Sequence, residues 1–231
     1  MQLQIENLNH HYGSAQTLHD INLQLDSGEC LAILGTNGVG KTTMLQCIMG
    51  LLPLTSGSVR FDQTDVSDWS THRRVQYGVG YVPQGRDIFS DLTIEENLEV
   101  GLPRADSRKR AERLGRVFEL FPVLLEMRKR RGGYLSGGQQ QQLAIGRALM
   151  SAPSLLILDE PTEGIQPSII QAIADVITQL KGEMTILLVE QYLDFARTVA
   201  DQFAVIARGE VVGGGRIDDF KVSQVSSLLA M

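Results

Sequence analysis

Apolar and polar positions alternate near the amino terminus, and apolar residues then gather into short continuous runs. Leu3-Gln4-Ile5 and residues 21–25 have the period-two alternation of strands with one buried face. After a turn at Ser27-Gly28, the apolar run 30–34 leads into a glycine-rich loop, and a helix is expected over residues 41–49. The pattern therefore predicts a strand, a loop and a helix in direct succession.

Further apolar runs predict a larger sheet with interleaved helices. Short strands are expected at residues 58–61 and 79–82. Residues 155–158 and 185–189 are almost wholly apolar, which is typical of parallel strands buried on both faces. A helix through residues 169–180 is expected between them, so this part of the chain predicts an α/β core.

The middle of the chain has a different pattern. Thr93-x-x-Glu96 is a capping box that starts a helix, and residues 107–131 are charged with apolar residues at helical spacing. We therefore predict one domain, in which residues 85–150 form a helical subdomain and residues 1–84 and 151–231 form the core. A hairpin over 203–212 and a short helix are expected to close the chain.

Composition narrows the possible partners. The 231 residues are 43% hydrophobic, which is enough for a sizeable core, and the formal net charge of -6 gives no uniform basic field to attract nucleic acid. We see no secretory signal, and the apolar runs are far shorter than the roughly 20 residues of a membrane-spanning helix. We expect a cytoplasmic protein that reaches a membrane only through partners.

Few residues could hold a metal through nitrogen or sulfur. Cys30 and Cys47 lack ligand spacing and are interpreted as buried apolar side chains, and His10-His11 has no convergent carboxylate, so no Zn²⁺ is expected. The basic run 128–131 is interpreted as a solvated helix end, and Trp69 as a packed anchor.

The glycine-rich loop fits a phosphate-binding pattern. Residues 35–42, GTNGVGKT, match G-x-x-x-x-G-K-[ST] between a predicted strand and a predicted helix. Backbone N–H groups of such a loop surround phosphates, and the helix amino terminus adds a favourable dipole. Lys41 is expected to reach the β and γ phosphates, and Thr42 to hold Mg²⁺.

Two acids follow the apolar run 155–158. Asp159 is placed beside the metal, and Glu160 where it can orient or deprotonate the attacking water. A solvated strand end is the alternative for this pair taken alone, and the upstream phosphate loop makes that alternative unattractive.

A second glycine motif identifies a family. Residues 135–139, LSGGQ, precede a helix predicted over 140–150 and form a second anion-binding amino terminus, which one nucleotide does not need. The chain resembles the ABC ATPase family, whose signature motif is LSGGQ, over essentially its whole length. The resemblance implies a P-loop α/β fold with an antiparallel β subdomain and a helical subdomain, and ATP bound between two subunits arranged head to tail.

The resemblance also assigns roles to matching positions. Tyr12 matches the aromatic residue that stacks on adenine, and Gln84 matches the glutamine that senses Mg²⁺ and the attacking water. The implied catalytic residues are Glu160, Gln84 and Gln191, and the implied Mg²⁺ ligands are Thr42, Gln84 and Asp159. The implied nucleotide-binding residues are Tyr12, Gly35, Asn37, Gly38, Gly40, Lys41, Thr42, Thr43, Ser136, Gly137, Gly138 and Gln139.

Two positions depart from the family pattern. Gln166 stands where an aspartate commonly links the two sites, and Gln191 stands where a histidine is usual. A glutamine amide can bond a phosphate oxygen but cannot carry an imidazolium charge. We therefore expect an asymmetric pair, whose other ATPase subunit supplies a histidine.

The segments that contain these two positions, residues 161–167 and 188–191, resemble the branch of the family that serves branched-chain amino-acid and urea importers. Residues 81–89, 121–124 and 190–195 are most similar to the urea-importer subunit, so urea is the expected solute. The resemblance implies a second ATPase subunit, membrane permease subunits and, indirectly, a solute-binding protein, with this chain on the inner face of the plasma membrane. A branched-chain amino-acid importer, an exporter ATPase and a soluble ABC ATPase remain alternatives, whereas a GTPase would need an N-K-x-D element that the chain lacks.

Overall fold

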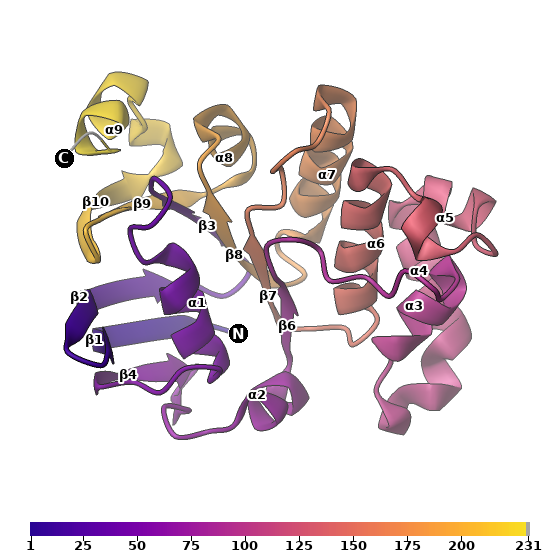
Figure 1. The fold of residues 1–231 in the computed structure, drawn as a ribbon, viewed down its shortest axis with the longest axis horizontal. Helices are drawn as coiled ribbons and strands as arrows, with labels where there is room; N and C mark the ends of the chain where they lie inside the picture. Colours follow the sequence, from indigo (N-terminus) through magenta and orange to yellow (C-terminus); the bar gives the residue numbers. More distant parts are fainter. Residues whose placement is uncertain (230–231) are drawn as a thin grey trace.

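The computed structural model describes residues 1–229, except for the side chain of Ala105, and it contains two sheets (Figure 1). The larger sheet has six strands, and β10 is antiparallel to β9 while the other neighbouring strands are parallel. Its order is β10 (Glu210–Arg216), β9 (Gln202–Ala207), β3 (Cys30–Leu34), β8 (Thr185–Glu190), β7 (Leu155–Asp159) and β6 (Val79–Val82). The expected strands and the terminal hairpin are confirmed.

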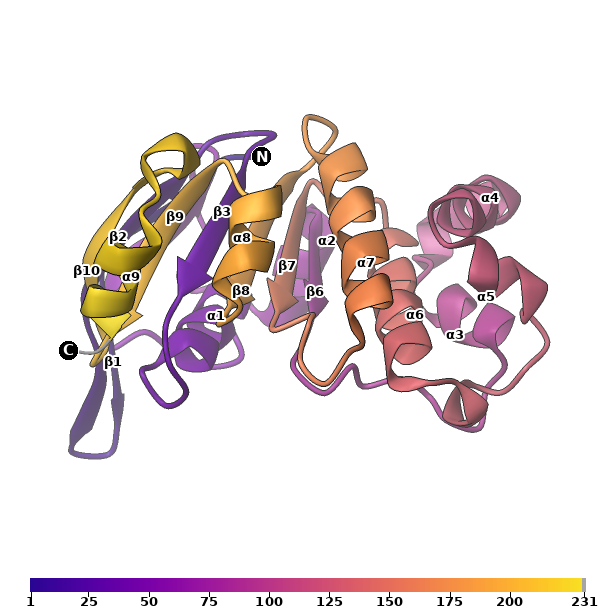
Figure 2. The ribbon, with the colours of Figure 1, turned by 90° about the horizontal axis from the view of Figure 1, so that it is seen from above.

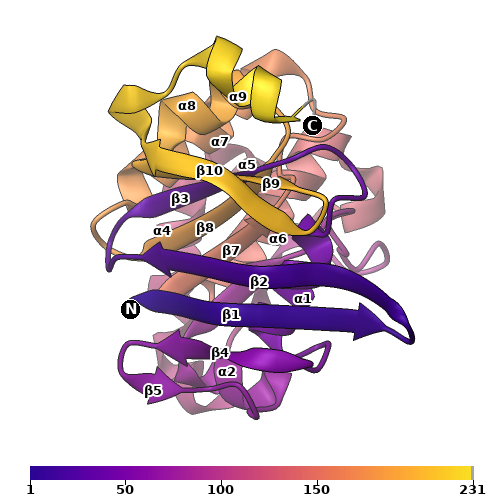
Figure 3. The same cartoon turned by 90° about the vertical axis from the view of Figure 1, so that its left-hand side faces the viewer.

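The smaller sheet is antiparallel and, in Figure 3, lies next to β10 and in front of β7 and β8 of the larger one. Its order is β2 (Ala15–Leu25), β1 (Leu3–Tyr12), β4 (Ser56–Phe61) and β5 (Thr64–Asp65). Helix α1 (Lys41–Met49) is packed in one apolar cluster with this sheet and with one face of the larger sheet. The loop before α1 therefore starts from a rigid, fully buried position.

Alternate residues of the central strands bury on opposite faces. In β7, Leu155 and Ile157 join the cluster around α1, whereas Leu156 and Leu158 join a second cluster on the other face. That second face is covered by α6 (Gly137–Leu149), α7 (Pro167–Leu180), α8 (Leu193–Val199) and α9 (Val222–Leu229) (Figure 2). Burial on both faces explains why these strands are continuous apolar runs.

Helices fill the middle of the chain. They comprise α3 (Ile94–Val100), the 3-10 segment Arg104–Lys109, α4 (Arg110–Leu120), α5 (Pro122–Glu126), the 3-10 turn Gly132–Tyr134 and α6. The capping box at Thr93 and Glu96 is present, as predicted. Helix α6 begins at Gly137 rather than at residue 140, because Ser136 caps it and places both glycines in the first turn.

The polar connection after β5 was not expected to be structured, yet it contains α2 (Thr71–Tyr77). Arg74 of this helix is 1% exposed, and its guanidinium donates to the carbonyls of Cys47 and Ile48 in α1 at 2.9 and 2.6 Å. It also donates to the carbonyls of Ser67 and Trp69. A buried cation therefore ties the end of α1 to the next connection.

The predictions for the two cysteines and for Trp69 are confirmed. Cys30 and Cys47 are buried thiols, and Trp69 packs against the core beneath the guanidinium of Arg73 at 3.8 Å. The 3-10 turn Ile217–Asp219 connects β10 to α9. Over residues 1–229, no helix combines the length and apolar character required to cross a bilayer.

Candidate functional site

The phosphate loop joins β3 to α1 in a conformation that glycine permits. Gly38 and Gly40 have φ of 83° and 104°, in the left-handed region where other residues are strained. A Cβ on Gly35 would lie 2.8 Å from the carbonyl oxygen of Ile206, and one on Gly40 would lie 2.9 Å from Leu18. Strands β9 and β2 therefore contact the loop so closely that a side chain at either glycine would displace it.

The loop borders an open cavity of about 190 Å³. Its walls come from four parts of the chain: β2, the loop with the start of α1, the end of β6, and the end of β7. The lining residues are Thr17, Asn37, Gly38, Gly40, Lys41, Thr42, Thr43, Gln84 and Glu160. Thr17 was not expected here, since nothing in the sequence near it distinguishes it from other strand residues.

Lys41 lies buried at the back of this cavity. Its ammonium donates to the carbonyls of Gly35 and Thr36, both at 2.9 Å, and forms an ion pair with Glu160 Oε1 at 3.1 Å. Both side chains of the pair are nearly inaccessible to solvent. An anion entering the cavity would compete with Glu160 for the ammonium.

Glu160 is contacted by two amides from distant segments. Gln84 Nε2 donates to its Oε2 at 3.3 Å, and Gln191 Nε2 donates to its Oε1 at 2.9 Å. Gln191 also donates to Asn37 Oδ1 at 2.6 Å, and Gln84 donates to Glu163 at 2.9 Å. The structure therefore gathers the residues named from sequence as catalytic around one carboxylate.

The backbone at Glu160 is also unusual. Its φ is 47°, in the left-handed region that a non-glycine residue rarely adopts, and its N–H donates to the carbonyl of Val189 at 2.9 Å. This bond ties the turn after β7 to β8, so the carboxylate is held toward the phosphate loop by the turn itself.

Asp159 ends β7 with a side chain poor in partners. Neither carboxylate oxygen has a hydrogen-bond partner among the described residues, although the Thr42 hydroxyl lies near. Burial and then the charge of Glu160 raise the pKa of Asp159 to about 6, while Thr42 and Lys41 act in the opposite direction. Two buried, unpaired carboxylate oxygens near a threonine hydroxyl fit the oxygen ligands of a divalent cation.

The signature segment is placed apart from this cavity. Ser136 Oγ accepts from the N–H of Gln139 at 3.3 Å, and Gln139 Oε1 accepts from the N–H of Ser136 at 3.0 Å. The N–H groups of Gly137 and Gly138 donate to no other group among residues 1–229. Gly138 is packed against α7, where a Cβ would lie 2.8 Å from Ile169.

None of residues 136–139 lines the cavity around Lys41. Tyr12, expected to stack on adenine, does not line it either: this side chain is 49% exposed at the end of β1, with its ring 4.7 Å from that of His10. His10 Nδ1 lies 2.8 Å from the carbonyl oxygen of Pro53. Among the described residues, no group of three or more His, Cys, Asp or Glu side chains could hold a metal ion.

Two residues near these segments were missed from the sequence. Arg86 donates to the carbonyl of Glu163 at 3.1 Å and its guanidinium lies against Gly137, so it connects the turn after β6 with the signature segment. Glu190 is buried directly behind Gln191. A signal existed for Glu190, because it follows an apolar strand as Asp159 does.

The family model described as "ABC transporter" matches residues 18–163, which is more than half of the chain. The chain belongs to the ABC transporter family. It is therefore an ATP-binding ATPase subunit that powers transport, and the α/β fold expected from the resemblance is confirmed.

Two relatives and one solved structure show which members of the family this chain is similar to. The high-affinity branched-chain amino acid transport ATP-binding protein BraG of Pseudomonas aeruginosa is 41% identical over 91% of each chain. The probable branched-chain amino acid transport ATP-binding protein LivF of Archaeoglobus fulgidus is 34% identical over 92% of this chain and 91% of LivF. A dimeric bacterial ABC transporter cassette is 26% identical, with a TM-score of 0.84, and covers 94% of this chain and all of its own.

Proposed function

We propose that this chain is one of two ATPase subunits of an importer, and that it encloses ATP by closing head to tail on its partner. The observation that carries this proposal is the separation of two anion-binding segments. The cavity at Lys41 and the N–H groups of Gly137 and Gly138 belong to one chain, yet no signature residue lines the cavity. A nucleotide held by both segments would need a second subunit.

Binding at the cavity would rearrange one ion pair. The phosphate tail would lie against the N–H groups of residues 35–42 at the start of α1, where the helix dipole favours negative charge. The γ phosphate would replace Glu160 as the partner of Lys41. Release of Glu160 would free its carboxylate for the attacking water.

A divalent cation has fitting ligands beside the phosphates. Thr42, Asp159 and Gln84 would hold Mg²⁺, and the ion when bound would neutralise charge on the phosphate oxygens. Burial and the charge of Glu160 raise the pKa of Asp159 to about 6. The carboxyl group therefore loses its proton below neutral pH, and the ionised form can bind the cation.

Hydrolysis would then depend on three side chains of this chain. Glu160 would orient or deprotonate the attacking water, while the amides of Gln84 and Gln191 hold it in place through the bonds at 3.3 and 2.9 Å. Gln191 cannot supply an imidazolium charge. An asymmetric pair, with a histidine from the second ATPase subunit, remains our proposal for the other site.

The solute is proposed from the relatives. BraG and LivF are both named for branched-chain amino acids, so we propose a branched-chain amino acid as the imported solute. Urea, expected from short segments of sequence, has no support from these relatives and stays an untested prediction. The helices of residues 85–150 are proposed to form a subdomain that docks on the permease at the inner face of the membrane.

Reconstitution tests this function. The chain would be assembled with its neighbouring permease, second ATPase and binding protein, and ATP turnover measured with leucine or urea. Stimulation by leucine alone is expected. Stimulation by urea alone would overturn the solute and leave the ATPase role intact, whereas no stimulation by any solute would count against import.

A further inference from the structure

Glu190 is a buried carboxylate that forms no ion pair with any side chain of the described residues. It ends β8, is 2% exposed, and accepts four hydrogen bonds. Its Oε1 accepts from the N–H and the hydroxyl of Thr162, at 3.1 and 2.8 Å. Its Oε2 accepts from the N–H groups of Gln191 and Tyr192, at 3.0 and 3.3 Å. Each carboxylate oxygen of Glu190 therefore accepts hydrogen bonds from a different segment of the chain.

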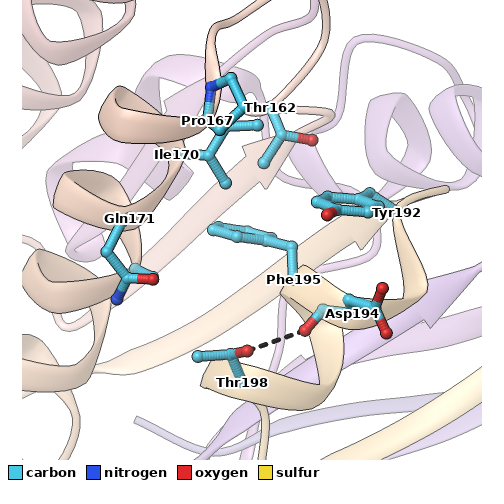
Figure 4. Close-up of a pocket in the computed structure, with 9 residues that line it drawn as sticks. Thr162, Pro167, Ile170, Gln171, Tyr192, Asp194, Phe195 and Thr198 are labelled. Atoms are coloured by element: carbon cyan, nitrogen blue, oxygen red, sulfur yellow. Dashed lines mark hydrogen bonds between the residues drawn. The ribbon is translucent and has the colours of Figure 1, made fainter.

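The two segments are the turns that follow neighbouring strands. Thr162 lies in the turn after β7, which carries Glu160 and Glu163, and Gln191 begins the turn after β8. Thr162 and Tyr192 also line one pocket of about 520 Å³ between α7 and α8 (Figure 4). Two side-chain links join these turns: Gln191 donates to Glu160, and the Glu190 carboxylate accepts from the backbone of both turns.

The site residues are attached to the same turns. Gln191 Nε2 contacts Glu160 and Asn37, while Glu163 accepts from Gln84. A shift of either turn would therefore change how the amide of Gln191 meets the carboxylate of Glu160. Glu190 itself does not line the cavity.

The chemistry of the link requires a carboxylate. Three of the four groups that face Glu190 are backbone N–H groups, which can only donate, with at least one on each turn, and a carboxylate has two oxygens that accept only. A glutamine would turn an NH₂ group toward one turn and set donors against donors. Burial of an ion is costly unless it is fully hydrogen-bonded, as it is here.

We infer that Glu190 is a positioning residue for ATP hydrolysis, whose carboxylate fixes the turn of Gln191 against the turn of Glu160 so that the Gln191 amide holds the catalytic carboxylate. The inference deepens the proposed role of Glu160 and Gln191 and rests on it. We expect ATP binding to depend on this link much less than hydrolysis does, because Gln191 reaches the phosphate loop only through Asn37, and Lys41 lies on another segment.

The first test is Glu190→Gln in the assembled transporter. The expected result is a fall of about tenfold in kcat, which corresponds to one misplaced interaction in the transition state, with KM for ATP changed by less than about twofold. The matched control is Thr185→Val at the opposite end of β8. Thr185 is also fully buried and also joins two segments, through Gly28 N–H at 2.9 Å and the Met1 carbonyl at 2.6 Å.

The control separates positioning from stability. Thr185→Val is expected to lower the melting temperature but to leave kcat unchanged. If kcat falls equally in both variants when their melting temperatures fall equally, Glu190 is only structural and the inference is overturned. An unchanged kcat in Glu190→Gln overturns it as well.

A double mutant tests the route. If Glu190 acts through Gln191, then Glu190→Gln should cost less than about twofold in kcat once Gln191→Ala is present, since coupled residues are not additive. Fully additive losses would show that Glu190 acts elsewhere, and a Gln191→Ala variant with normal kcat would remove the route altogether.

A measurement without turnover keeps this inference distinct from the proposed function. In the nucleotide-free chain, the side-chain amide signals of Gln191 should shift in Glu190→Gln and stay in place in Thr185→Val, as seen by NMR. Unmoved signals would sink the positioning role even in an active transporter. Absence of ATP turnover in the wild-type assembly would instead sink the proposed function and leave the NMR result standing.

Discussion

The two anion-binding segments of this chain differ in how far their polar groups are already paired. Around the phosphate loop, Lys41 has three acceptors and Glu160 has three donors, all from the same chain. At the signature segment, the side chains of Ser136 and Gln139 cap each other's N–H groups, and the N–H groups of Gly137 and Gly138 have no partner among residues 1–229. The phosphate loop therefore has its charged side chains paired within the chain, whereas the signature segment keeps two N–H groups without a partner among the described residues.

In the proposed mechanism this difference gives the two segments separate roles. The phosphate loop would bind the phosphate tail by exchanging Glu160 for phosphate at Lys41. The unpaired N–H groups of Gly137 and Gly138 would contact the phosphate held by the loop of the partner subunit.

Removing the charge of Glu160 tests the phosphate loop most strongly. Glu160→Gln should lower ATP turnover by about a thousandfold, within the range of general acid–base catalysis, and should tighten ATP binding because Lys41 loses its internal anion. Turnover and calorimetric titration measure the two effects. Glu163→Gln is the control, since Glu163 also contacts Gln84 but is exposed and does not contact Lys41. Turnover of Glu160→Gln within about threefold of wild type would contradict the role of Glu160.

Asp159 gives a prediction about stability. Its folded pKa of about 6 lies above the usual 3.8, so the folded chain binds more protons between these values and its stability falls as pH rises through them. Above pH 6, the ionised carboxylate of Asp159 lowers the free energy of unfolding by about 3 kcal/mol. Asp159→Asn should therefore raise the stability of the metal-free chain.

Denaturation as a function of pH checks this effect. The advantage of Asp159→Asn should be full above pH 6, shrink as pH falls toward 4, and be reduced by saturating Mg²⁺ and ATP, which favour the ionised wild-type side chain. A pH-independent difference would show that Asp159 is not strained by burial in the way proposed.

The signature segment should respond differently. Ser136→Ala removes a helix cap worth about 1 kcal/mol and a donor for the partner's phosphate, so turnover in the assembled pair should fall about fivefold to tenfold. Binding of ATP to the isolated chain should not change. Thr93→Ala removes the equivalent cap of α3 and is the matched control for the lost helix stability.

Pair formation with ATP and the second subunit is the measurement for this comparison. It should weaken for Ser136→Ala and remain for Thr93→Ala. Weaker ATP binding by the isolated Ser136→Ala chain would mean that one chain uses both segments on one nucleotide, which would break the comparison.

Gln191→His should have the smallest effect. A neutral imidazole has one N–H to donate, whereas Gln191 donates to both Asn37 and Glu160, so a loss of less than about threefold in turnover is expected. The variant should acquire a pH dependence between about 6 and 7 as the ring protonates. An unchanged pH profile would show that residue 191 does not face the reacting groups.

The elements that sequence predicted well are those with a local signal. The loop at residues 35–42 lies between an apolar strand and a helix, so its glycines and Lys41 could be placed from their neighbours alone. Alternation and capping boxes similarly reported β1 and α3. Contacts inside one short segment were therefore predictable.

The features that were missed depend on segments far apart in the chain. Arg74 lies in a polar stretch, and only the carbonyls of Cys47 and Ile48 at the end of α1 explain why its charge is buried. The cap that the Gln139 side chain forms on its own helix was not predicted, and its contact with the partner's phosphate stays a prediction. Glu190 needed the pairing of β7 with β8 before its partners could be named.

The most direct test is the mass and nucleotide content of Glu160→Gln mixed with its companion ATPase subunit. With saturating ATP, the pair should form and retain nucleotide through gel filtration, and the further change Ser136→Ala should weaken it. A Glu160→Gln chain that binds ATP tightly but stays monomeric beside its companion would contradict the shared site.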